Sequence, residues 1–444
     1  MAGTRQSRVR YLIVLMLFLA SSFSYGDRVV LSIIGVALSK ELLLTPIKLG
    51  YLLSAFSWAY VVAQLPAGGL LDRYGSKRVY GYSIIGWSIC AIVAGFTGFL
   101  PVSIAFAALF FIRLLSGAVQ APVFPGNGRI VAAWFPAAER GRASAIFNSS
   151  QYFALVFFGP LMGWLVTQHN WEACFWLGGV MSLALSAVWF RTVYSVKDHP
   201  SISQAEFSHI EAGGGLASMD HGSVRPASTL SWTGVKLLLG NRMLVGIYIG
   251  QYCITALTWF FLTWFPIYLS QARHMSMQKV GFLSAVPALC GVVGGILGGF
   301  VSDTLLHRTK SASIARKTPI VLGMLCSLTM IGCNYTDSNT VVVALMALAF
   351  FGKGFGALGW TVIADVSPRN MIGLNGGLFN LIGNTAGITT PIIIGYIREK
   401  TGSFNLALVY VGVMALTAIV SYLFLVGDIK RVEFTPEQLQ GTAS

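Results

Sequence analysis

The stretch GGLLDRYGSKR, residues 68–78, joins two apolar runs and has a partial copy, GGFVSD, at residues 298–303. The positions that recur at a common displacement of 231 residues are Gly50, Gly68 and Asp72, which become Gly281, Gly299 and Asp303. At a displacement of 232, Phe147-Asn148 and Gly163-Trp164 become Phe379-Asn380 and Gly395-Tyr396. Unrelated matches would not share one displacement, so the chain is predicted to consist of two similar halves.

The composition is that of a membrane protein. Of 444 residues, 55% are hydrophobic and only 10% are charged, against about 25% charged in an average soluble domain. The 49 glycines agree with this class, because small residues let membrane helices approach closely. The net charge of +14 comes from basic residues scattered between apolar runs, which argues against a nucleic-acid partner. The six cysteines form no CxxC pair and the six histidines fall in connecting segments, so neither a disulfide framework nor a metal site is predicted.

Twelve apolar runs are long enough to cross a bilayer, which takes about 20 residues. The predicted spans are 11–36, 48–71, 79–99, 103–125, 143–167, 173–192, 244–270, 279–302, 318–335, 340–365, 372–397 and 404–427. The first run carries charges and lacks a small-residue cleavage site, so it is expected to be a retained helix. The predicted organisation is a first bundle (1–192), a cytoplasmic central loop (193–243), a second bundle (244–430) and a cytoplasmic tail (431–444).

The loops alternate in basic content. The N-terminus, the loops after the second, fourth and eighth runs, the central loop and the tail are rich in Lys and Arg, and the opposite loops are poor in them. By the positive-inside rule both termini and the central loop are predicted to be cytoplasmic. Two repeated halves further imply a pseudo-twofold axis along the membrane normal, a substrate site at mid-depth between the halves, and alternating access.

The stretch 68–78 resembles the signature loop of the major facilitator superfamily, and GGFVSD resembles its weaker second copy. The resemblance implies a gating role for Asp72, Arg73 and Asp303. Asp72 is suited to face the positive end of a neighbouring half-helix. For the basic residues the alternative is contact with lipid head groups that only fixes topology.

A narrower resemblance covers nearly the whole chain. The segments that carry it are SYGDR, SAFSWAYVVAQLPAGGLLDRYGSKRVY, APVFPGNGRIVAAWFP, FFLTWFP, IARKTPI, MALAFFGKG and YLFLVGDIKR. Together they resemble the anion:cation symporter branch, and within it bacterial transporters of glucarate, galactarate and galactonate. The resemblance implies an inner-membrane, proton-coupled importer of sugar acids.

Four charged residues interrupt the apolar runs at depth: Asp27, Arg28, Arg113 and Lys353. A cation at mid-membrane costs at least about 2.5–3.5 kcal/mol unless it faces water or a partner. Three cations against one anion leave an excess of two positive charges, which a sugar diacid would neutralise better than a monoacid. The alternative is that these cations pair with helix-end carbonyls or snorkel to the interface.

Uncharged polar and aromatic residues supply further candidates. The resemblance assigns Tyr60, Gln151, Gln251, Trp360 and Asn380 to the substrate site, where amides and an aromatic face would suit a hydroxylated carbon chain. Hydrogen bonding between helices is the alternative for each amide. Three more polar residues on the same faces stay provisional, namely Asn148, Thr255 and Thr258.

Asp27 and Gln120 are the candidates for proton coupling. A carboxylate poorly solvated in a helix bundle suits proton uptake, and protonation of Asp27 would release nearby cations such as Arg113. Gln120 stands where the family usually carries a glutamate, and glutamine is close in shape to a protonated glutamic acid but cannot titrate. Glutamine at this position is either a natural difference that changes proton coupling or an alteration that mimics the protonated carrier. A third interpretation is that Gln120 is only an amide that packs between helices.

The sequence therefore predicts an all-α membrane protein of twelve helices that imports a hexaric diacid with protons as a monomer. A sugar monoacid such as galactonate or a hexuronate is the alternative substrate, and an anion channel a less favoured function. A membrane enzyme is disfavoured because nucleophile and metal constellations are missing. No phosphate-binding loop of the GxxxxGK[ST] type is present, so a gradient must drive transport, and no cofactor is expected.

Overall fold

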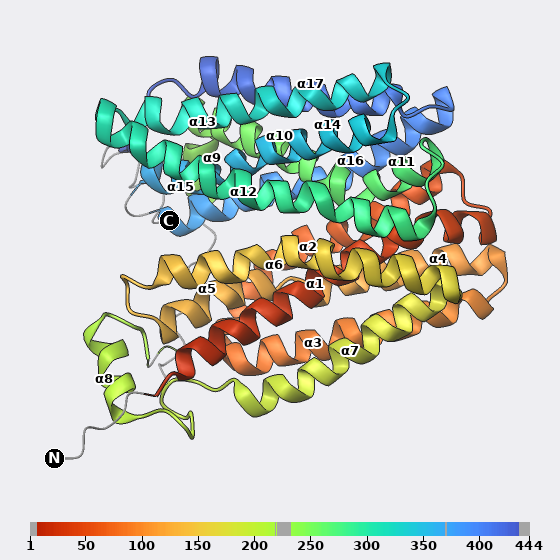
Figure 1. Ribbon diagram of the computed structural model, residues 1–444. Coiled ribbons are helices and arrows are strands. Elements are labelled where there is room, and N and C mark those ends of the chain that lie inside the picture. The colour runs from red at the N-terminus through yellow and green to blue at the C-terminus, as the bar shows by residue number, and fades with distance from the viewer. Residues whose placement is uncertain (1–6, 218, 220–231, 369–370, 435–444) are drawn as a thin grey trace.

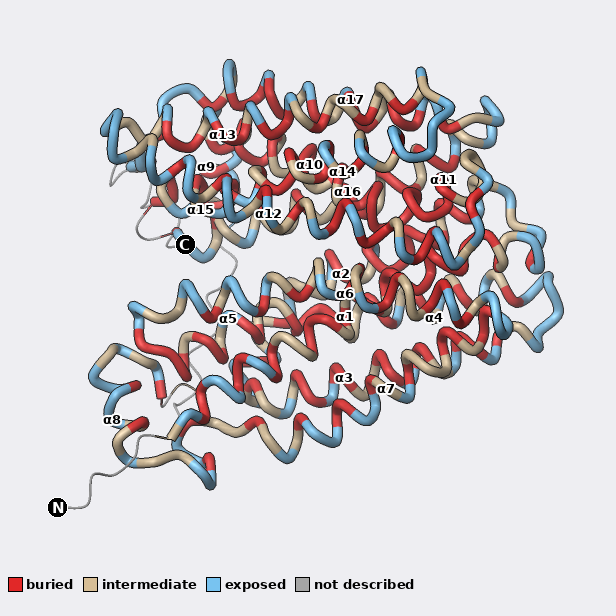
Figure 2. Tube along the Cα trace, in the orientation of Figure 1, coloured by how far each residue is buried: buried red, intermediate tan, exposed pale blue. Residues whose placement is uncertain are grey.

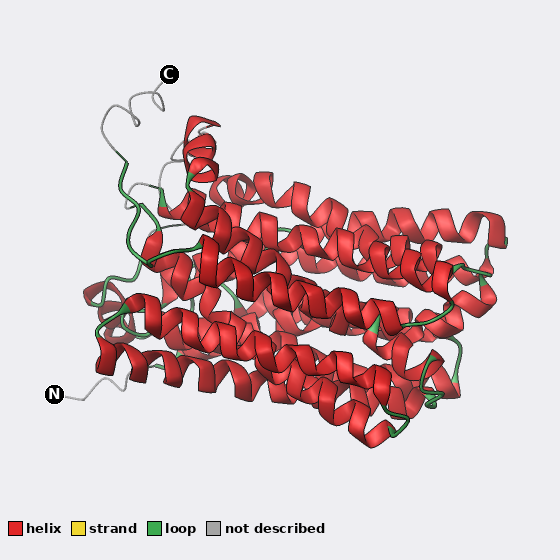
Figure 3. Ribbon diagram, turned by 90° about the horizontal axis from the view of Figure 1, so that it is seen from above, coloured by secondary structure: helices red, strands yellow, loops and turns green. Residues whose placement is uncertain are grey.

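The computed structural model describes residues 7–217, 219, 232–368 and 371–434, and in these ranges every regular element is a helix (Figures 1 and 3). The helices of the first half are α1 (Val9–Glu41), α2 (Pro46–Tyr74), α3 (Ser76–Gly95), α4 (Val102–Gln120), α5 (Val123–Trp134), α6 (Arg140–Gln168) and α7 (Trp171–Thr192). Two short helices follow, α8 (Gln204–Ala212) and α9 (Trp232–Gly240). Parts of the predicted central loop and tail, residues 220–231 and 435–444, lie outside the described residues.

The second half repeats the pattern of long helices. Its helices are α10 (Arg242–Thr263), α11 (Phe265–Gln271), α12 (Met277–Thr309), α13 (Ala312–Ser327), α14 (Asn339–Phe355), α15 (Gly359–Val366), α16 (Ile372–Thr401) and α17 (Asn405–Val420). Three crossings consist of two helices in succession, α4–α5, α10–α11 and α14–α15. The first break coincides with Pro122 and the second with Pro266, because proline removes a backbone donor and clashes with the preceding turn.

Within the described residues eleven segments are both long and apolar enough to cross a membrane. The twelfth crossing is α2, which is 29 residues long but carries Gln64, Asp72 and Arg73, which lower its mean hydropathy. The crossings correspond one to one with the predicted apolar runs, so the prediction of an all-α fold with twelve crossings is confirmed. Most of the helices extend a few residues past their apolar runs, because their polar ends lie outside the span.

The polar segment after α7 packs on the first half near the N-terminus (Figure 1). Glu206 of α8 is fully buried, and its carboxylate accepts hydrogen bonds from the Ser7 hydroxyl and from the backbone N–H groups of Val9 and Arg10. These N–H groups belong to the first turn of α1, where no intrahelical partner exists. A carboxylate there also stabilises the positive end of the helix dipole.

The two halves lie side by side, the first from red to yellow-green and the second from green to blue (Figure 1). They meet mainly through two helix pairs, α2 with α16 and α6 with α12, and α1 also contacts α10 and α11. The buried segments gather where the halves meet, at the end away from the two termini (Figure 2). At the end that holds the termini the packing is looser. An added Cβ would have no other atom within 4 Å at three glycines there: Gly68, Gly299 and Gly376.

The repeated glycines explain why these two helix pairs can pack so closely. A Cβ on Gly50 of α2 would lie 2.6 Å from the carbonyl oxygen of Pro391 in α16, and one on Gly395 would lie 2.7 Å from that of Pro46. In the other pair, a Cβ on Gly281 of α12 would lie 2.5 Å from the carbonyl oxygen of Gly159 in α6. Only glycine permits such backbone contact. The internal repeat in the sequence therefore places one glycine-lined crossing on each side of the pseudo-twofold axis.

Gly395→Ala should force α16 away from α2 and destabilise the contact between the halves. Overpacking of this kind typically costs about 1–3 kcal/mol, so we expect a clear fall in Tm of the purified protein in detergent. Gly376→Ala in the same helix is the matched control, because no atom lies within 4 Å of its added Cβ, and it should leave Tm unchanged or higher. Equal Tm values for the two variants would contradict this account of the crossing.

Candidate substrate and proton site

A buried ion pair joins the first and fourth crossings. Nη1 of Arg113 on α4 lies 2.9 Å from Oδ2 of Asp27 on α1, and their side chains are only 4% and 7% exposed. In such surroundings each charge would be costly alone, and the pair removes most of that cost through a charge-assisted hydrogen bond. Arg113 is therefore neutralised within the protein as the structure stands.

Two more residues of α4 hold the same carboxylate oxygen. The Ser116 hydroxyl donates to Oδ2 of Asp27 at 3.2 Å and Nε2 of Gln120 donates to it at 2.9 Å. The hydroxyl of Ser24 donates to Oε1 of Gln120 at 2.7 Å, which fixes the orientation of the amide. With Arg113, Oδ2 has three side-chain donors. Gln120 acts here as a donor to Asp27.

Arg28, one residue after Asp27, points into a different environment. Its guanidinium carbon lies 4.3 Å from the ring centroid of Phe56 and 4.9 Å from those of Tyr25 and Tyr60. Aromatic faces attract a desolvated cation, but they do not neutralise it. Its buried Nε has no hydrogen-bond partner, and among the described residues no carboxylate forms an ion pair with it. Arg28 is thus a buried cation without a counter-ion.

Lys353 of α14 is the corresponding cation of the second half. It is 8% exposed, and its Nζ lies 5.1 Å from the ring centroid of Phe350 and 6.0 Å from that of Tyr152 on α6. No ion pair to Lys353 occurs in the part of the chain that the structure describes. In each half, therefore, a buried cation has no carboxylate partner among the residues that the structure describes.

The predicted amides are divided between the halves. Nδ2 of Asn380 on α16 donates to Oε1 of Gln64 on α2 at 3.3 Å, which links the two halves. Gln251 of α10 donates to Thr255 at 3.3 Å within its own helix, and Gln151 of α6 donates to the backbone of Asn148 at 3.3 Å. These weak local bonds leave the amides with capacity for a ligand.

The predicted aromatic residues differ in exposure. Tyr60 is almost fully buried beside Arg28, whereas the side chain of Trp360 on α15 is largely exposed and packs edge-on against Phe379, with 4.9 Å between ring centroids. Of the provisional residues, Thr255 accepts the bond from Gln251 and Thr258 donates to its own helix at Ile254.

The predicted gating residues lie at the end of the bundle that holds the termini. Asp72 pairs with Arg129 of α5, and Asp303 lies 3.5 Å from Arg316 of α13, which also contacts Asp365 at 3.1 Å. These pairs join helices of the same half. The guanidinium of Arg73 lies over the neighbouring Tyr74 ring, 5.3 Å from its centroid.

Several residues of this site were not predicted from the sequence. Ser24, Tyr25, Gln64, Ser116 and Tyr152 all contact predicted residues. For three of them a signal existed, because Ser116 follows Arg113 by three positions, Gln64 follows Tyr60 by four and Tyr25 precedes Arg28 by three, which places each pair on one helix face. Ser24 and Tyr152 contact their partners across helices, and no local spacing indicates that.

The fold has twelve membrane crossings in two halves that meet at glycines. Among the described residues it also buries two cations, Arg28 and Lys353, without a carboxylate partner. Together these features define a polytopic membrane transporter. Residues 17–359 match the family model described as Major Facilitator Superfamily. The chain belongs to this superfamily, and it is a transporter and not an enzyme.

Close relatives have transport names. The chain is 54% identical to a "Probable galactarate/D-glucarate transporter" of Escherichia coli (strain K12), over 97% of this chain and 96% of the relative. It is 56% identical to one of the same name from Bacillus subtilis (strain 168), over 97% and 94%. A "D-galactonate transporter" of Escherichia coli O6:H1 is 38% identical over 97% and 98%.

Solved structures agree in fold. The crystal structure of a D-xylose-proton symporter superposes with a TM-score of 0.70 at 12% identity, covering 95% of this chain and 98% of that one. An inward-open structure of the xylose transporter from E. coli gives a TM-score of 0.67 at 13% identity, covering 97% and 99%. At this level of identity the likeness shows the fold alone.

Removal of Arg113 should leave Asp27 as a buried, uncompensated charge. Breaking a buried pair from one side costs about 3–5 kcal/mol, so we expect Arg113→Met to lower the free energy of unfolding by that amount. Asp27→Asn in the same background removes the stranded charge and should restore most of the stability. Denaturant unfolding of the two single variants and the double variant gives the coupling energy. A double variant as unstable as Arg113→Met would show that the pair is not the source of the effect.

Proposed function

We propose that this protein imports a hexaric sugar diacid, galactarate or D-glucarate, together with protons by alternating access. The names of the relatives at 54% and 56% identity support the substrate class. The buried charges support it independently. Asp27 neutralises Arg113, whereas Arg28 of the first half and Lys353 of the second have no carboxylate partner among the described residues.

The two uncompensated cations are the observation that carries the proposal. A hexaric diacid has one carboxylate at each end of a six-carbon chain, so it can neutralise a cation from each half at once. The planar guanidinium of Arg28 suits a bidentate bond to one carboxylate, and the compact ammonium of Lys353 suits the other. The aromatic rings around both cations exclude water and strengthen these contacts.

The uncharged residues would bind the hydroxyl groups between the two carboxylates. Gln151, Gln251 and Asn380 present amides that can donate and accept, and the exposed face of Trp360 suits the C–H side of a sugar carbon chain. Tyr60, beside Arg28, adds a hydroxyl close to the first carboxylate. Because Asn380 also contacts Gln64 of the other half, a ligand there would act on the link between the halves.

Asp27 would couple this binding to a proton. Protonation removes the charge that neutralises Arg113, and it leaves a cation that needs a new anion. The substrate carboxylate is that anion, so proton and substrate are each bound more tightly in the presence of the other, and the coupling is reciprocal. Gln120 cannot accept a second proton and stays a hydrogen-bond donor to Asp27.

Alternating access would proceed by rocking of the halves about the substrate. They now touch through Gly50 and Gly281 at one end, and the gating residues Asp72, Arg73 and Asp303 lie at the other. The basic loops at the end with the termini support an inner-membrane location with both termini in the cytoplasm, which makes this an inward-open arrangement. Since both halves of the site come from one chain, we propose that the monomer is the working unit.

Counterflow in proteoliposomes tests the proposed substrate. Labelled glucarate should enter vesicles preloaded with unlabelled glucarate or galactarate, and galactonate and glucuronate should compete weakly. Lys353→Asn should weaken diacid transport by about tenfold or more, the value of a charge-assisted hydrogen bond, and affect monoacid transport less. Trp58→Phe, a change in an exposed residue, serves as the control variant.

A monoacid transporter is the alternative, favoured by the relative named for D-galactonate. Preference for galactonate over glucarate in the wild-type protein, with equal losses of both in Lys353→Asn, would overturn the assignment of a diacid. Ionic conductance without saturable counterflow would instead indicate a channel.

Gln120→Glu should make uptake more dependent on pH. The new carboxylate would lie beside Oδ2 of Asp27, at the position from which Nε2 now donates at 2.9 Å, and two such carboxylates share a proton. We expect the rate of glucarate uptake to fall more steeply between acidic and alkaline pH than in the wild type. Asp27→Asn is the reference, since it should abolish proton-driven uptake and retain counterflow. An unchanged pH profile in Gln120→Glu would count against a role of this position in coupling.

A further inference from the structure

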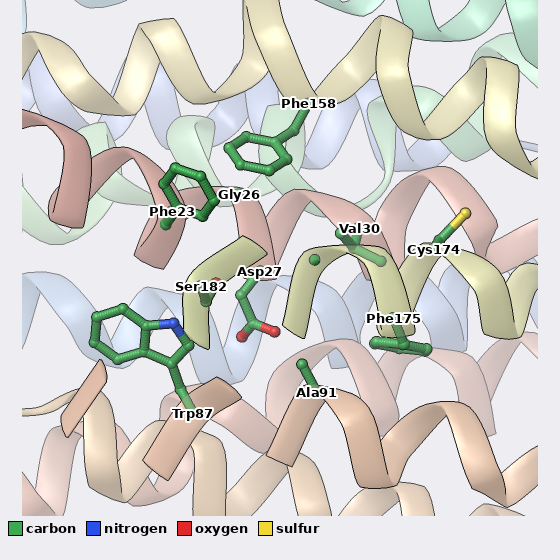
Figure 4. Close-up of a pocket in the computed structure, with 11 residues that line it drawn as sticks. Phe23, Gly26, Asp27, Val30, Trp87, Ala91, Phe158, Cys174, Phe175 and Ser182 are labelled. Carbon is green, nitrogen blue, oxygen red and sulfur yellow. The ribbon is translucent and has the colours of Figure 1, made fainter. Parts of the chain in front are cut away.

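A small cavity lies beside Asp27 (Figure 4), and the residues that line it come from helices other than α4. It is enclosed by α1, α3, α6 and α7, within the first half, and its volume of about 10 Å³ is enough for one water molecule. Most of its lining is apolar, including Phe158 and Phe175. Three polar side chains also line it: Asp27 of α1, Trp87 of α3 and Ser182 of α7.

The three polar groups have unused hydrogen-bonding capacity. Trp87 is fully buried and its indole Nε1 has no partner. Figure 4 shows this nitrogen on the edge of the ring that faces Ser182 and Asp27. All the donors to Asp27 use Oδ2, and within the described residues no hydrogen bond is made to Oδ1. An unpartnered buried N–H costs about 1–3 kcal/mol, which indicates that something in the cavity accepts from it.

The groups around Asp27 differ on its two sides. Arg113 of α4 is the charged side chain on the side of Oδ2. At the cavity, Cys174 of α7 is part of the lining, and Cys90 of α3 interacts electrostatically with both Asp27 and Arg113. The α6 helix contributes Phe158, which does not titrate. Among the described residues no side chain donates to Oδ1, so a proton can reach this oxygen without displacing a hydrogen bond.

We propose that this cavity is a water-binding site that delivers the coupled proton to Oδ1 of Asp27. The bound water accepts from Nε1 of Trp87, exchanges a hydrogen bond with the Ser182 hydroxyl and donates to Oδ1, which gives it the three partners typical of a buried water. In the transfer step a proton carried by water forms an O–H bond on Oδ1 and leaves neutral water behind. This inference deepens the proposed function and rests on its assignment of Asp27 to proton coupling.

The site explains how protonation can occur while Oδ2 keeps its donors. A proton that entered from the substrate side would have to displace Arg113, Ser116 or Gln120 first. From the cavity it reaches the free oxygen directly, and the bond to Arg113 weakens only after the charge has gone. Proton and substrate would thus approach Asp27 from opposite sides, so that neither needs to pass the other.

The water itself can be tested without any transport measurement. A structure of the wild-type protein in nanodiscs, at a resolution that shows ordered water, should contain a water within hydrogen-bond distance of both Nε1 of Trp87 and Oδ1 of Asp27. Trp87→Phe should lose it. A dry cavity in the wild type would overturn the proposal, whatever the substrate proves to be.

The role in coupling is tested with Trp87→Phe and Ser182→Ala in proteoliposomes. Each should slow glucarate uptake driven by a pH gradient by about threefold to tenfold, the effect of one lost hydrogen bond. Counterflow at equal pH on both sides should stay close to wild type, because it needs no net proton transfer. The Asp27→Asn variant gives the rate of uptake expected when proton coupling is lost completely.

Two matched variants control for packing. Ser186→Ala, one turn further along α7, removes a hydroxyl that only bonds its own helix at Leu183. Trp189→Phe removes an equally buried indole whose Nε1 donates to the backbone of Lys77. Both should retain proton-driven uptake. Equal losses of uptake and counterflow in Trp87→Phe and Ser182→Ala would show a packing role and overturn the relay. If glucarate uptake by the wild-type protein does not depend on the pH gradient, the proposed proton coupling is wrong. The bound water would then have only a structural role.

Discussion

A charge inside a membrane bundle must be neutralised, and the arrangement of this protein follows from how that requirement is met. Asp27 and Arg113 neutralise each other across α1 and α4 at 2.9 Å. That distance depends on Gly117, one turn after Arg113, where a Cβ would overlap the backbone of Phe56. The missing side chain lets α4 lie against α2, so that Phe56 contacts the guanidinium of Arg28 as well as that of Arg113. This one close contact between α4 and α2 thus positions both Arg113, which is paired with Asp27, and Arg28, which has no carboxylate partner among the described residues.

The two halves share their packing but not their charges. Gly50 and Gly281 lie at equivalent helix–helix contacts between the halves. This shared role explains why glycine recurs at the same position of each half. At the same displacement Asp27 corresponds to Thr258, whose hydroxyl bonds its own helix. Among the described residues the second half therefore offers no acid that pairs with Lys353. A symmetric framework permits rocking, and under the proposed function the asymmetric charges would confine proton chemistry to the first half while both halves bind substrate.

Much of the fold could be predicted from the sequence, because lipid requires about 20 apolar residues for every crossing. The break at Pro122 and the duplicated glycines were also visible as local patterns. The site was predictable only in part. Arg28, Arg113 and Lys353 were identified because a buried cation is conspicuous in an apolar run, and Asp27 for the same reason. Their surroundings were not, since Tyr25 and Phe56 are ordinary aromatic residues until α1 and α2 pack together and bring them around the guanidinium of Arg28.

The amide at position 120 shows why a partner matters more than a residue type. Ser24 donates to Oε1 of Gln120, so Nε2 must face Asp27. A glutamate there would add a second negative charge beside one arginine, and the unloaded network would be anionic unless it already held a proton. With glutamine the network of Asp27 and Arg113 is neutral when unloaded. In the proposed mechanism a single proton makes it cationic, and this is the smallest change that would convert a closed ion pair into a receptor for an anion.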